Sequence, residues 1–337
     1  MKAIGYRTAG PISAAASLED LELPAPQPGP RDLRVAVRAI SVNPADVKLR
    51  ASVSPPVGEL RILGFDAAGV VDAVGAAVTL FKPGDEVFYA GAIDRPGSNS
   101  ELQLVDERIV GRKPTTLDFG QAAALPLTSI TAWEILFERL AVPYGVKSHT
   151  GALLIVNGAG GVGSMLTQLA RRLTGLTVIA TASRPETVAW CHEMGAHHVI
   201  SHHRSFSDEL GKLRIPHVDL VAGLTATDKH LADIESVLVP HGRLALIDDP
   251  DVLNIVSFKR KSISVHWELM FTPSLYQTAD MIAQHRLLDE VADLVDAGVL
   301  RTTMTANVGC INAENLRKAH ALVESSRAIG KTVLTGF

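Results

Sequence analysis

The stretch of the chain that decides its fold is residues 153–163, which read LLIVNGAGGVG. An apolar run typical of a buried strand leads directly into a Gly-x-Gly-x-x-Gly loop formed by Gly158, Gly160 and Gly163. A helical pattern follows, with apolar side chains at Met165, Leu166, Leu169, Ala170 and Leu173. Strand, loop and helix in this order are the context in which such a loop binds the pyrophosphate of a dinucleotide.

Each glycine of the loop has a physical role in that context. Gly158 allows the tight turn, Gly160 lets the backbone approach a pyrophosphate, and Gly163 lets the helix pack closely on the sheet. The N–H groups and the positive dipole end at the helix N-terminus favour the phosphates. We therefore assign the loop, including Gly161 and Val162, to cofactor binding rather than to a simple glycine-rich turn.

The residues after the next strand indicate which dinucleotide binds. The strand at residues 176–181 ends about 20 residues past the loop, where a carboxylate would bind the ribose hydroxyls of NAD. The chain has Ser183 and Arg184 there, and Glu186 comes only later. A hydroxyl and a guanidinium would hold a 2′-phosphate that a carboxylate repels, so we expect NADPH (NADP) as the cofactor. The alternative is that Arg184 is a solvated loop residue.

Length and composition fit a soluble two-domain enzyme, for which we expect a small-molecule substrate as the partner. The chain has 337 residues, of which 47% are hydrophobic and 20% are charged, enough to bury two cores. Its net charge of −4 argues against a nucleic-acid-binding surface. The most apolar long region, residues 60–81, is interrupted by Arg61, Asp66, Asp72 and several glycines, so we expect no membrane span.

Cysteine usage and the N-terminal residues indicate the cellular compartment. The two cysteines, Cys191 and Cys310, cannot make a disulfide framework, which favours a reducing environment. Residues 1–6 have the pattern of a strand and lack the apolar stretch of a signal peptide. We therefore expect a cytoplasmic protein.

The pattern of the chain changes near residue 120 and predicts two domains. Residues 1–122 carry short apolar runs separated by turns, such as 33–40, 69–75 and 86–90, as in a compact β-barrel. Residues 123–294 alternate helix and strand, which predicts a doubly wound parallel sheet. The strands of this second domain are expected near Ala152, Thr177, His217, Arg243 and Ser262.

The C-terminal residues 295–337 are predicted to return to the first domain. They hold a helix from about Ala313 to Ser325 and a final strand at residues 332–334. We expect this segment to pack back onto the domain formed by residues 1–122.

Further motifs give the whole chain a resemblance to a known family. They are SVNPAD at 41–46, GFDAAGVV at 64–71, FKPGDEV at 81–87, GSNSE at 97–101, AALPLTSITAW at 123–133, the glycine loop, and GKTVL at 330–334. In this order and spacing they make the chain resemble the medium-chain dehydrogenase/reductase superfamily, and within it the quinone oxidoreductase branch. The resemblance implies an α/β protein with a Rossmann doubly wound parallel sheet and a GroES-like β-barrel catalytic domain.

More narrowly, the chain is similar to a bacterial subgroup usually called zinc-type alcohol dehydrogenase-like proteins. By motif, the zinc ligands of the family match Asn43, Phe65 with Asp66, and Leu127 in this chain. Phenyl and leucyl side chains cannot bind a metal, and an amide is a poor zinc ligand. The family's structural zinc needs four cysteines, and this chain has 2. We therefore expect neither a catalytic nor a structural zinc.

Without a metal, fewer of the reactions that the resemblance implies remain possible. Ionising an alcohol or polarising an isolated ketone is difficult at neutral pH when no Lewis acid is present. A conjugated acceptor is easier, because the charge that hydride brings spreads over an enolate or a quinone ring. We expect hydride transfer from NADPH to a quinone or an α,β-unsaturated carbonyl, with the protein supplying orientation and hydrogen bonds to the oxyanion.

Four residues are candidates for the catalytic role. Asn43 matches the family's first zinc ligand, so its amide should face the nicotinamide and donate to a carbonyl oxygen; as a residue before proline it also suits a simple turn. Asp46 orients that loop or contacts the nicotinamide ribose, unless it only caps the next turn. Arg50 and Tyr89 are donors that could line the cleft, although Tyr89 also suits a core aromatic with its hydroxyl at the edge.

The resemblance also implies cofactor contacts outside the glycine loop. Thr131 matches a family threonine near the nicotinamide, and Lys331 matches a basic residue near the cofactor. His202 matches a tyrosine beside the adenosine phosphate, so it would assist Ser183 and Arg184. Gly223 and Ile247 follow the fourth and fifth strands, at carboxyl ends where ligands bind open sheets.

Two alternative functions and one assembly stay open. The alternatives are an alcohol dehydrogenase with an unusual or absent metal, acting on alcohols or aldehydes, and a non-catalytic NADPH-binding sensor or structural relative. Apolar residues alternate along 262–267 as in an edge strand that pairs with a second copy, which favours a homodimer through the cofactor domain. A buried last strand would explain the pattern nearly as well.

Overall fold

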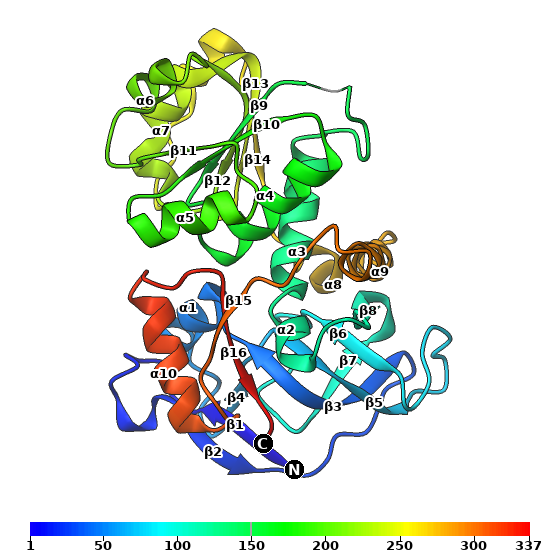
Figure 1. The fold of residues 1–337 in the computed structure, drawn as a ribbon. Coiled ribbons are helices and arrows are strands. Elements are labelled where there is room, and N and C mark those ends of the chain that lie inside the picture. The colour runs from blue at the N-terminus through cyan, green and yellow to red at the C-terminus, as the bar shows by residue number, and fades with distance from the viewer. Residues whose placement is uncertain (149) are drawn as a thin grey trace. The chain divides into compact units, whose positions relative to one another are not determined.

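The computed structural model describes residues 1–148 and 150–337 and divides into two compact units (Figure 1). The first unit combines Met1–Ile130 with Phe271–Phe337, and the second unit is Thr131–Met270. The expected boundaries, 1–122 with 295–337 and 123–294, therefore differ from those of the structure. Residues 123–130 and 271–294 belong to the first unit.

The observed boundary differs from the expected one because a C-terminal helix packs on the β-structure of the first unit. Helix α9 (Ala283–Asp296) lies against β8 (Val110–Arg112), and Leu288 contacts that strand. The ring Nδ1 of His285 lies 2.7 Å from the carbonyl oxygen of Val110. The carboxylate of Asp289 accepts from the N–H of Arg112 at 2.8 Å. An amphipathic helix such as α9 is typically half-buried, but its pattern does not identify the sheet that it covers.

The first unit is built on a largely antiparallel seven-stranded sheet. Its strand order is β15-β16-β3-β5-β6-β8, and β7 pairs with β3 outside this path. The strands are β3 (Asp32–Ser41), β5 (Asp66–Val74), β6 (Glu86–Tyr89), β7 (Leu102–Asp106), β8 (Val110–Arg112), β15 (Met304–Asn307) and β16 (Lys331–Thr335). A smaller sheet has the order β2-β1-β4, with β1 (Lys2–Tyr6), β2 (Glu19–Glu22) and β4 (Arg61–Ile62). This confirms a β-rich GroES-like domain in the N-terminal part of the chain.

Short helices connect these strands, and the C-terminal segment returns as predicted. Strand β16 pairs antiparallel with β3, where Leu334 lies opposite Ile40. Helix α10 (Ala313–Glu324) packs against α1 (Pro44–Ser52). The other helical elements of this unit are η1 (Ala15–Ser17), η2 (Glu107–Ile109), α2 (Phe119–Ala123) and α8 (Thr272–Tyr276). Helix α3 (Pro126–Trp133) starts in the first unit and ends in the second.

The second unit is a parallel sheet of six strands in the order β11-β10-β9-β12-β13-β14. Its strands are β9 (Ala152–Val156), β10 (Thr177–Thr181), β11 (His198–Ile200), β12 (Val218–Gly223), β13 (Leu238–Leu246) and β14 (Ser264–Trp267). Numbered from β9, this is the 3-2-1-4-5-6 order of a Rossmann fold, so the predicted doubly wound sheet is confirmed. Of the six strands, the short β11 was not predicted.

Helices cover both faces of this sheet. Figure 1 shows α4 and α5 on one side and α6 and α7 on the other. Their bounds are α4 (Gly161–Leu173), α5 (Pro185–Glu193), α6 (Phe206–Lys212) and α7 (Thr227–Val237), with the π-helical turn η3 (Glu134–Arg139) and the 3-10 helix η4 (Val256–Lys261). All five apolar positions that predict α4 are buried. The periodicity of that segment therefore identifies buried positions correctly, although Ser164, Thr167 and Gln168 between them are buried as well.

The glycine loop joins β9 to α4 as the sequence predicts. A Cβ on Gly163 would lie 2.4 Å from the carbonyl oxygen of Asn157 and 2.7 Å from the Cα of Gly158. A side chain at this position would force the helix away from the strand. The close packing of α4 on the sheet therefore requires glycine at 163.

Two smaller expectations concern membranes and cysteines. Among the described residues, none of the helices combines the length and apolar character needed to cross a bilayer. Cys191 is a buried free thiol, and Cys310 is an exposed one.

We predict that Gly111→Ala destabilises the first unit by disturbing the α9 contact. A Cβ on Gly111 would lie 2.4 Å from Leu288 Cβ and 2.9 Å from Phe88 Cε1. Overpacking of this kind costs about 1–3 kcal/mol, measurable by urea unfolding. Gly10→Ala is the matched control, because no atom lies within 4 Å of the added Cβ. Equal stability of the two variants would contradict the assignment of α9 to this core.

Candidate functional site

The positions that correspond to the family's zinc ligands meet at one place in the first unit. The Asp66 carboxylate, at the start of β5, accepts a hydrogen bond from Asn43 Nδ2 at 2.8 Å. It also accepts from the backbone N–H of Leu127, near the start of α3, at 2.8 Å. Phe65 lies next to Asp66, with its ring 4.8 Å from that of Phe271. The motif match therefore identifies residues that are neighbours in space.

A lysine ammonium is bound among these residues. Lys331 Nζ, at the start of β16, donates to Asp66 Oδ2 at 2.9 Å, to the carbonyl oxygen of Val42 at 3.0 Å, and to Asn43 Oδ1. An ammonium group has three protons, so all three find an oxygen acceptor. Lys331 is 4% exposed. It was expected near the cofactor, and the structure places it beside the residues that match zinc ligands.

The Asp66 carboxylate is fully hydrogen-bonded although it has no exposure to solvent. Besides Asn43, Lys331 and the Leu127 N–H, it accepts from Ser41 Oγ at 2.7 Å. Burying a carboxylate is costly unless a cation and hydrogen bonds compensate it, and here both are present. We call Ser41, Asn43, Asp66 and Lys331 the lysine–aspartate cluster.

Asp46 caps helix α1 and so holds the loop that carries Asn43, a contact that fits both the loop-orienting role and the simple cap given above as its alternative. Its carboxylate accepts from the Asn43 N–H at 2.8 Å and from the Gly64 N–H at 3.0 Å. This is the return contact of a capping box at the start of α1. Burial raises the pKa of Asp46 to about 7, although the two N–H groups and the Lys331 charge oppose the shift. The proximity of Asp66 adds to the increase.

Arg50 and Tyr89 do not belong to the cluster. Arg50 is 1% exposed and donates to the carbonyl oxygen of Gly10 and to the carboxylate of Glu324 on α10. Tyr89 is fully buried in the hydrophobic core of the first unit, and its hydroxyl has no hydrogen-bond partner among the described residues. Burial raises the pKa of Tyr89. These contacts favour packing roles for both residues over the cleft-lining role that we expected.

The remaining predicted cofactor residues lie in the second unit, most of them at the carboxyl edge of its sheet. Ser183 and Arg184 follow β10, and His202 follows the neighbouring strand β11. Gly223 ends β12, and its carbonyl oxygen accepts from the N–H of Ile247 at 3.3 Å. The glycine loop leaves β9 at the same edge, because parallel strands share their carboxyl ends. Thr131 lies in the last part of α3 and is buried.

The charges around Arg184 and His202 bear on phosphate binding. Arg184 Nε lies 3.2 Å from the carboxylate of Glu186, and both side chains are partly exposed. The His202 ring lies 4.5 Å from that of His203 and 6.3 Å from that of His230. Burial and these two histidines lower the pKa of His202. In the free protein His202 is therefore neutral near pH 7.

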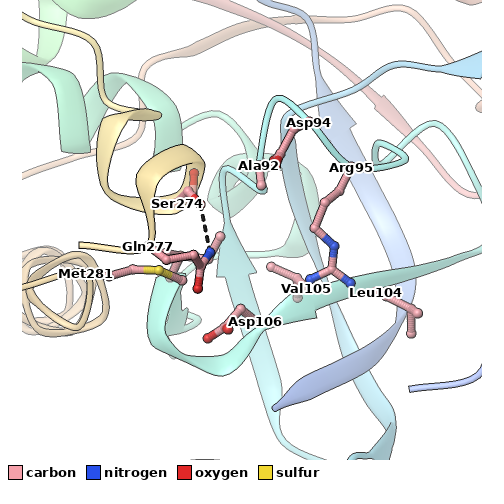
Figure 2. A pocket seen from close by; sticks show the side chains of 10 residues that line it. Ala92, Asp94, Arg95, Leu104, Val105, Asp106, Ser274, Gln277 and Met281 are labelled. Atoms are coloured by element: carbon pink, nitrogen blue, oxygen red, sulfur yellow. Dashed lines mark hydrogen bonds between the residues drawn. The ribbon is translucent and has the colours of Figure 1, made fainter. Parts of the chain in front are cut away.

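A small pocket elsewhere in the first unit is a less suitable site (Figure 2). It has a volume of about 50 Å³, and Arg95 and Asp106 are among its lining residues. Arg95 forms a bidentate pair with Asp32 at 2.8 and 2.9 Å. The dashed line in Figure 2 marks the bond from Gln277 Nε2 to the carbonyl oxygen of Ser274, at 2.7 Å. The pocket is too small for an organic substrate, and polar groups such as Arg95 and Gln277 are already hydrogen-bonded to other residues of the protein.

Two members of the cluster, Ser41 and Asp66, were not predicted as site residues. The available signal is a pair of opposite charges in segments that are otherwise apolar. Asp66 opens the run at 66–71, and Lys331 opens the final strand. Charged side chains inside buried strands require a partner, so each charge is a reason to look for the other.

Comparisons with known proteins agree with the fold and with the motifs. Residues 29–117 match the family model of an alcohol dehydrogenase GroES-like domain. Residues 194–334 match the model of a zinc-binding dehydrogenase. The first match lies in the first unit, and the second begins in the second unit and extends to β16.

Relatives with sequence similarity cover nearly the whole chain. A zinc-type alcohol dehydrogenase-like protein of Staphylococcus aureus is 40% identical over 342 residues, covering 99% of each chain. A quinone oxidoreductase of Pseudomonas aeruginosa is 30% identical and covers 91% of this chain and 92% of its own. A crystal structure of a Rhizobium etli protein assigned to the zinc-dependent alcohol dehydrogenases is 56% identical. It has a TM-score of 0.95 and covers 100% of this chain and 98% of its own.

We predict that Asp46 makes the stability of the protein depend on pH. The pKa of Asp46 rises from an ordinary 3.8 to about 7 on folding, so between these values the folded chain holds a proton that the unfolded chain releases. This contribution to the free energy of unfolding is therefore present at low pH and falls as pH rises through this window. Asp46→Asn removes the titration. The stability of the wild type relative to this variant should fall by up to about 4 kcal/mol between pH 4 and pH 8.

Urea unfolding of both proteins across this pH range is the measurement. Groups distant from Asp46 titrate equally in the two proteins and cancel in the difference, so the difference reports Asp46 together with its charged neighbours Asp66 and Lys331. Parallel pH profiles would show that the folded-state pKa of Asp46 is ordinary.

Proposed function

The chain belongs to the zinc-type alcohol dehydrogenase-like branch of the medium-chain dehydrogenase/reductase superfamily, and we propose that it transfers hydride from NADPH to a quinone or an α,β-unsaturated carbonyl without zinc. Membership in this family makes the protein an oxidoreductase of the medium-chain dehydrogenase/reductase type. Cofactor preference, acceptor class and independence of zinc are the parts that we propose.

The observation that carries the proposal is the ammonium of Lys331 at the place where the zinc-ligand positions meet. Zinc prefers thiolate, imidazole and carboxylate ligands in a set of three or four. Asp66 is the one carboxylate among the matched positions, and its oxygens already accept four hydrogen bonds. Asn43, Phe65 and Leu127 supply no ligand that zinc favours. The residues present therefore do not fit a catalytic zinc.

The cluster suits a reaction in which negative charge develops on an oxygen. A conjugated acceptor spreads that charge, so hydrogen bonding can replace a Lewis acid. Asn43 Nδ2 carries two protons, and Asp66 accepts one of them. The second N–H is the donor that we assign to the acceptor's oxygen. Asp46 fixes the backbone of Asn43, so this donor is held in place before the substrate binds.

The second unit supports NADPH as the hydride source. When bound, NADPH supplies the hydride, and the glycine loop would hold its pyrophosphate. Ser183 and Arg184 at the carboxyl edge would bind the 2′-phosphate, with His202 beside them. Gly223, Ile247 and Thr131 would line the remaining length of the cofactor. An acid at the end of β10 would favour NAD, and this chain has Ala182 and Ser183 there.

The edge of the second unit's sheet supports the expected homodimer. Among the described residues β14 pairs only with β13, which leaves its other edge for a partner strand. Trp267, the last residue of β14, is 55% exposed, and Leu269, two residues after it, is 50% exposed. We propose that a second copy covers them.

Turnover after chelator treatment tests the proposal. We expect the treated protein to oxidise NADPH with a panel of quinones and enones, and to be inactive with ethanol and NADP. Turnover restored only by added zinc would instead establish a zinc alcohol dehydrogenase. Binding of NADPH without turnover in either condition would favour a sensor or structural role.

Arg184→Ala tests the cofactor assignment separately. A charge-assisted contact to a phosphate is lost, so the KM for NADPH should rise about tenfold to a hundredfold. NADH lacks the 2′-phosphate, and its KM should change by less than about threefold. Arg172→Ala, which removes an exposed arginine from the last turn of α4, controls for loss of positive charge. An equal effect of Arg184→Ala on both cofactors would contradict 2′-phosphate binding.

A further inference from the structure

We propose that Lys331 is a positioning residue, a fixed internal cation that holds the Asn43 amide in its hydrogen-bonding orientation. The proposal has a structural part, a cation site formed by three oxygens. Its catalytic part rests on the proposed function, because it concerns the donor that Asn43 offers to the substrate oxygen.

The cation site is defined by the three acceptors of the Lys331 ammonium. They are Asp66 Oδ2 at 2.9 Å, the carbonyl oxygen of Val42 at 3.0 Å, and Asn43 Oδ1. One carboxylate, one carbonyl and one amide oxygen are the ligands that a small cation prefers. The side chain of Asp66 is fully buried and that of Lys331 is 4% exposed. The charges are therefore shielded from water, and their attraction is stronger than at the surface.

The same contacts fix which way the Asn43 amide faces. Its Oδ1 points at the Lys331 ammonium, and its Nδ2 donates to the Asp66 carboxylate at 2.8 Å. Rotating the amide by half a turn would place N–H groups against the ammonium and oxygen against the carboxylate. Both contacts would then be repulsive, so the charged neighbours on either side specify a single orientation. Without Lys331, one of these two constraints is lost.

Removing the ammonium also leaves the Asp66 charge without compensation. In Lys331→Ala the side-chain space opens, while the oxygens of Val42, Asn43 and Asp66 remain. A small cation from solution can occupy that space and make the same three contacts. Methylammonium matches the end of the lysine side chain, whereas tetramethylammonium has no N–H to donate.

The experiment measures the melting temperature and the kinetics of Lys331→Ala in ammonium, methylammonium and tetramethylammonium chloride at equal ionic strength. We expect kcat for quinone reduction to fall about a hundredfold, as on loss of a fixed oxyanion donor. The KM for NADPH should stay within about threefold of wild type. Methylammonium should raise the melting temperature and recover kcat at least about tenfold, and tetramethylammonium should do neither.

Two control variants separate positioning from general destabilisation. Lys331→Met keeps the side-chain stem, so it should lose activity and show no rescue, because the cation has no space to enter. Lys113→Ala removes another buried lysine of the first unit, whose Nζ donates to the carbonyl oxygens of Pro114 and Leu117. It should lower the melting temperature and leave kcat unchanged below that temperature.

Each result decides one part of the proposal. A kcat of Lys331→Ala within threefold of wild type would overturn the positioning role. Equal melting temperatures in methylammonium and tetramethylammonium would overturn the cation site. If Lys331→Ala does not fold, the double variant Lys331→Ala/Asp66→Asn removes the buried charge, and it should fold without responding to cations. A wild type without turnover would refute the proposed function, while the melting temperatures still decide the cation site.

Discussion

The buried pair of Lys331 and Asp66 is the interaction on which the first unit depends. It connects strand β16, near the C-terminal end of the chain, to strand β5, and the intervening strand β3 contributes Ser41. A pair of this kind adds little net stability when intact, because both charges have lost water. Removal of one partner costs several kcal/mol, since the other stays buried and charged. The geometry of the cluster is therefore strongly constrained, which suits a site that must hold one donor in a fixed place.

Charge balance explains how three ionisable groups share this interior. Lys331 and Asp66 cancel each other, and the raised pKa of Asp46 lets that carboxyl keep a proton near neutrality. The charges of Lys331 and Asp66 sum to zero before a substrate arrives, and the neighbouring carboxyl of Asp46 is partly protonated near pH 7. A reaction that brings negative charge next to the cluster meets an environment without an excess anion. The same fold with thiolate and imidazole in these positions would hold a metal, so a few side chains change the chemistry without changing the scaffold.

Local signals in the sequence predict much of the fold, and they fail where contacts are distant in the chain. The glycine loop and the periodicity of α4 depend on neighbouring residues, so both are readable from residues 153–173. The position of α9 cannot be predicted from neighbouring residues, because an amphipathic helix does not specify which sheet it covers. Lys331 and Asn43 are 288 residues apart, and only the folded chain brings them together. For Arg50 and Tyr89 the residue type indicates a donor, but Arg50 is bound to Gly10 and Glu324 and Tyr89 packs in the hydrophobic core, so both lie outside the cluster.

The order of the two units along the chain has a consequence for protein synthesis. The second unit is continuous, Thr131–Met270, so a ribosome makes all of it before it makes any residue of α9 or β16. The first unit is interrupted, and its buried carboxylate stays uncompensated until residue 331 has emerged. The cofactor-binding half can thus fold during translation, whereas the other half must wait for the end. A prematurely terminated product would lack both the strand that pairs with β3 and the ammonium that compensates Asp66, so its first unit would stay unfolded and exposed to the chaperones and proteases that remove incomplete chains.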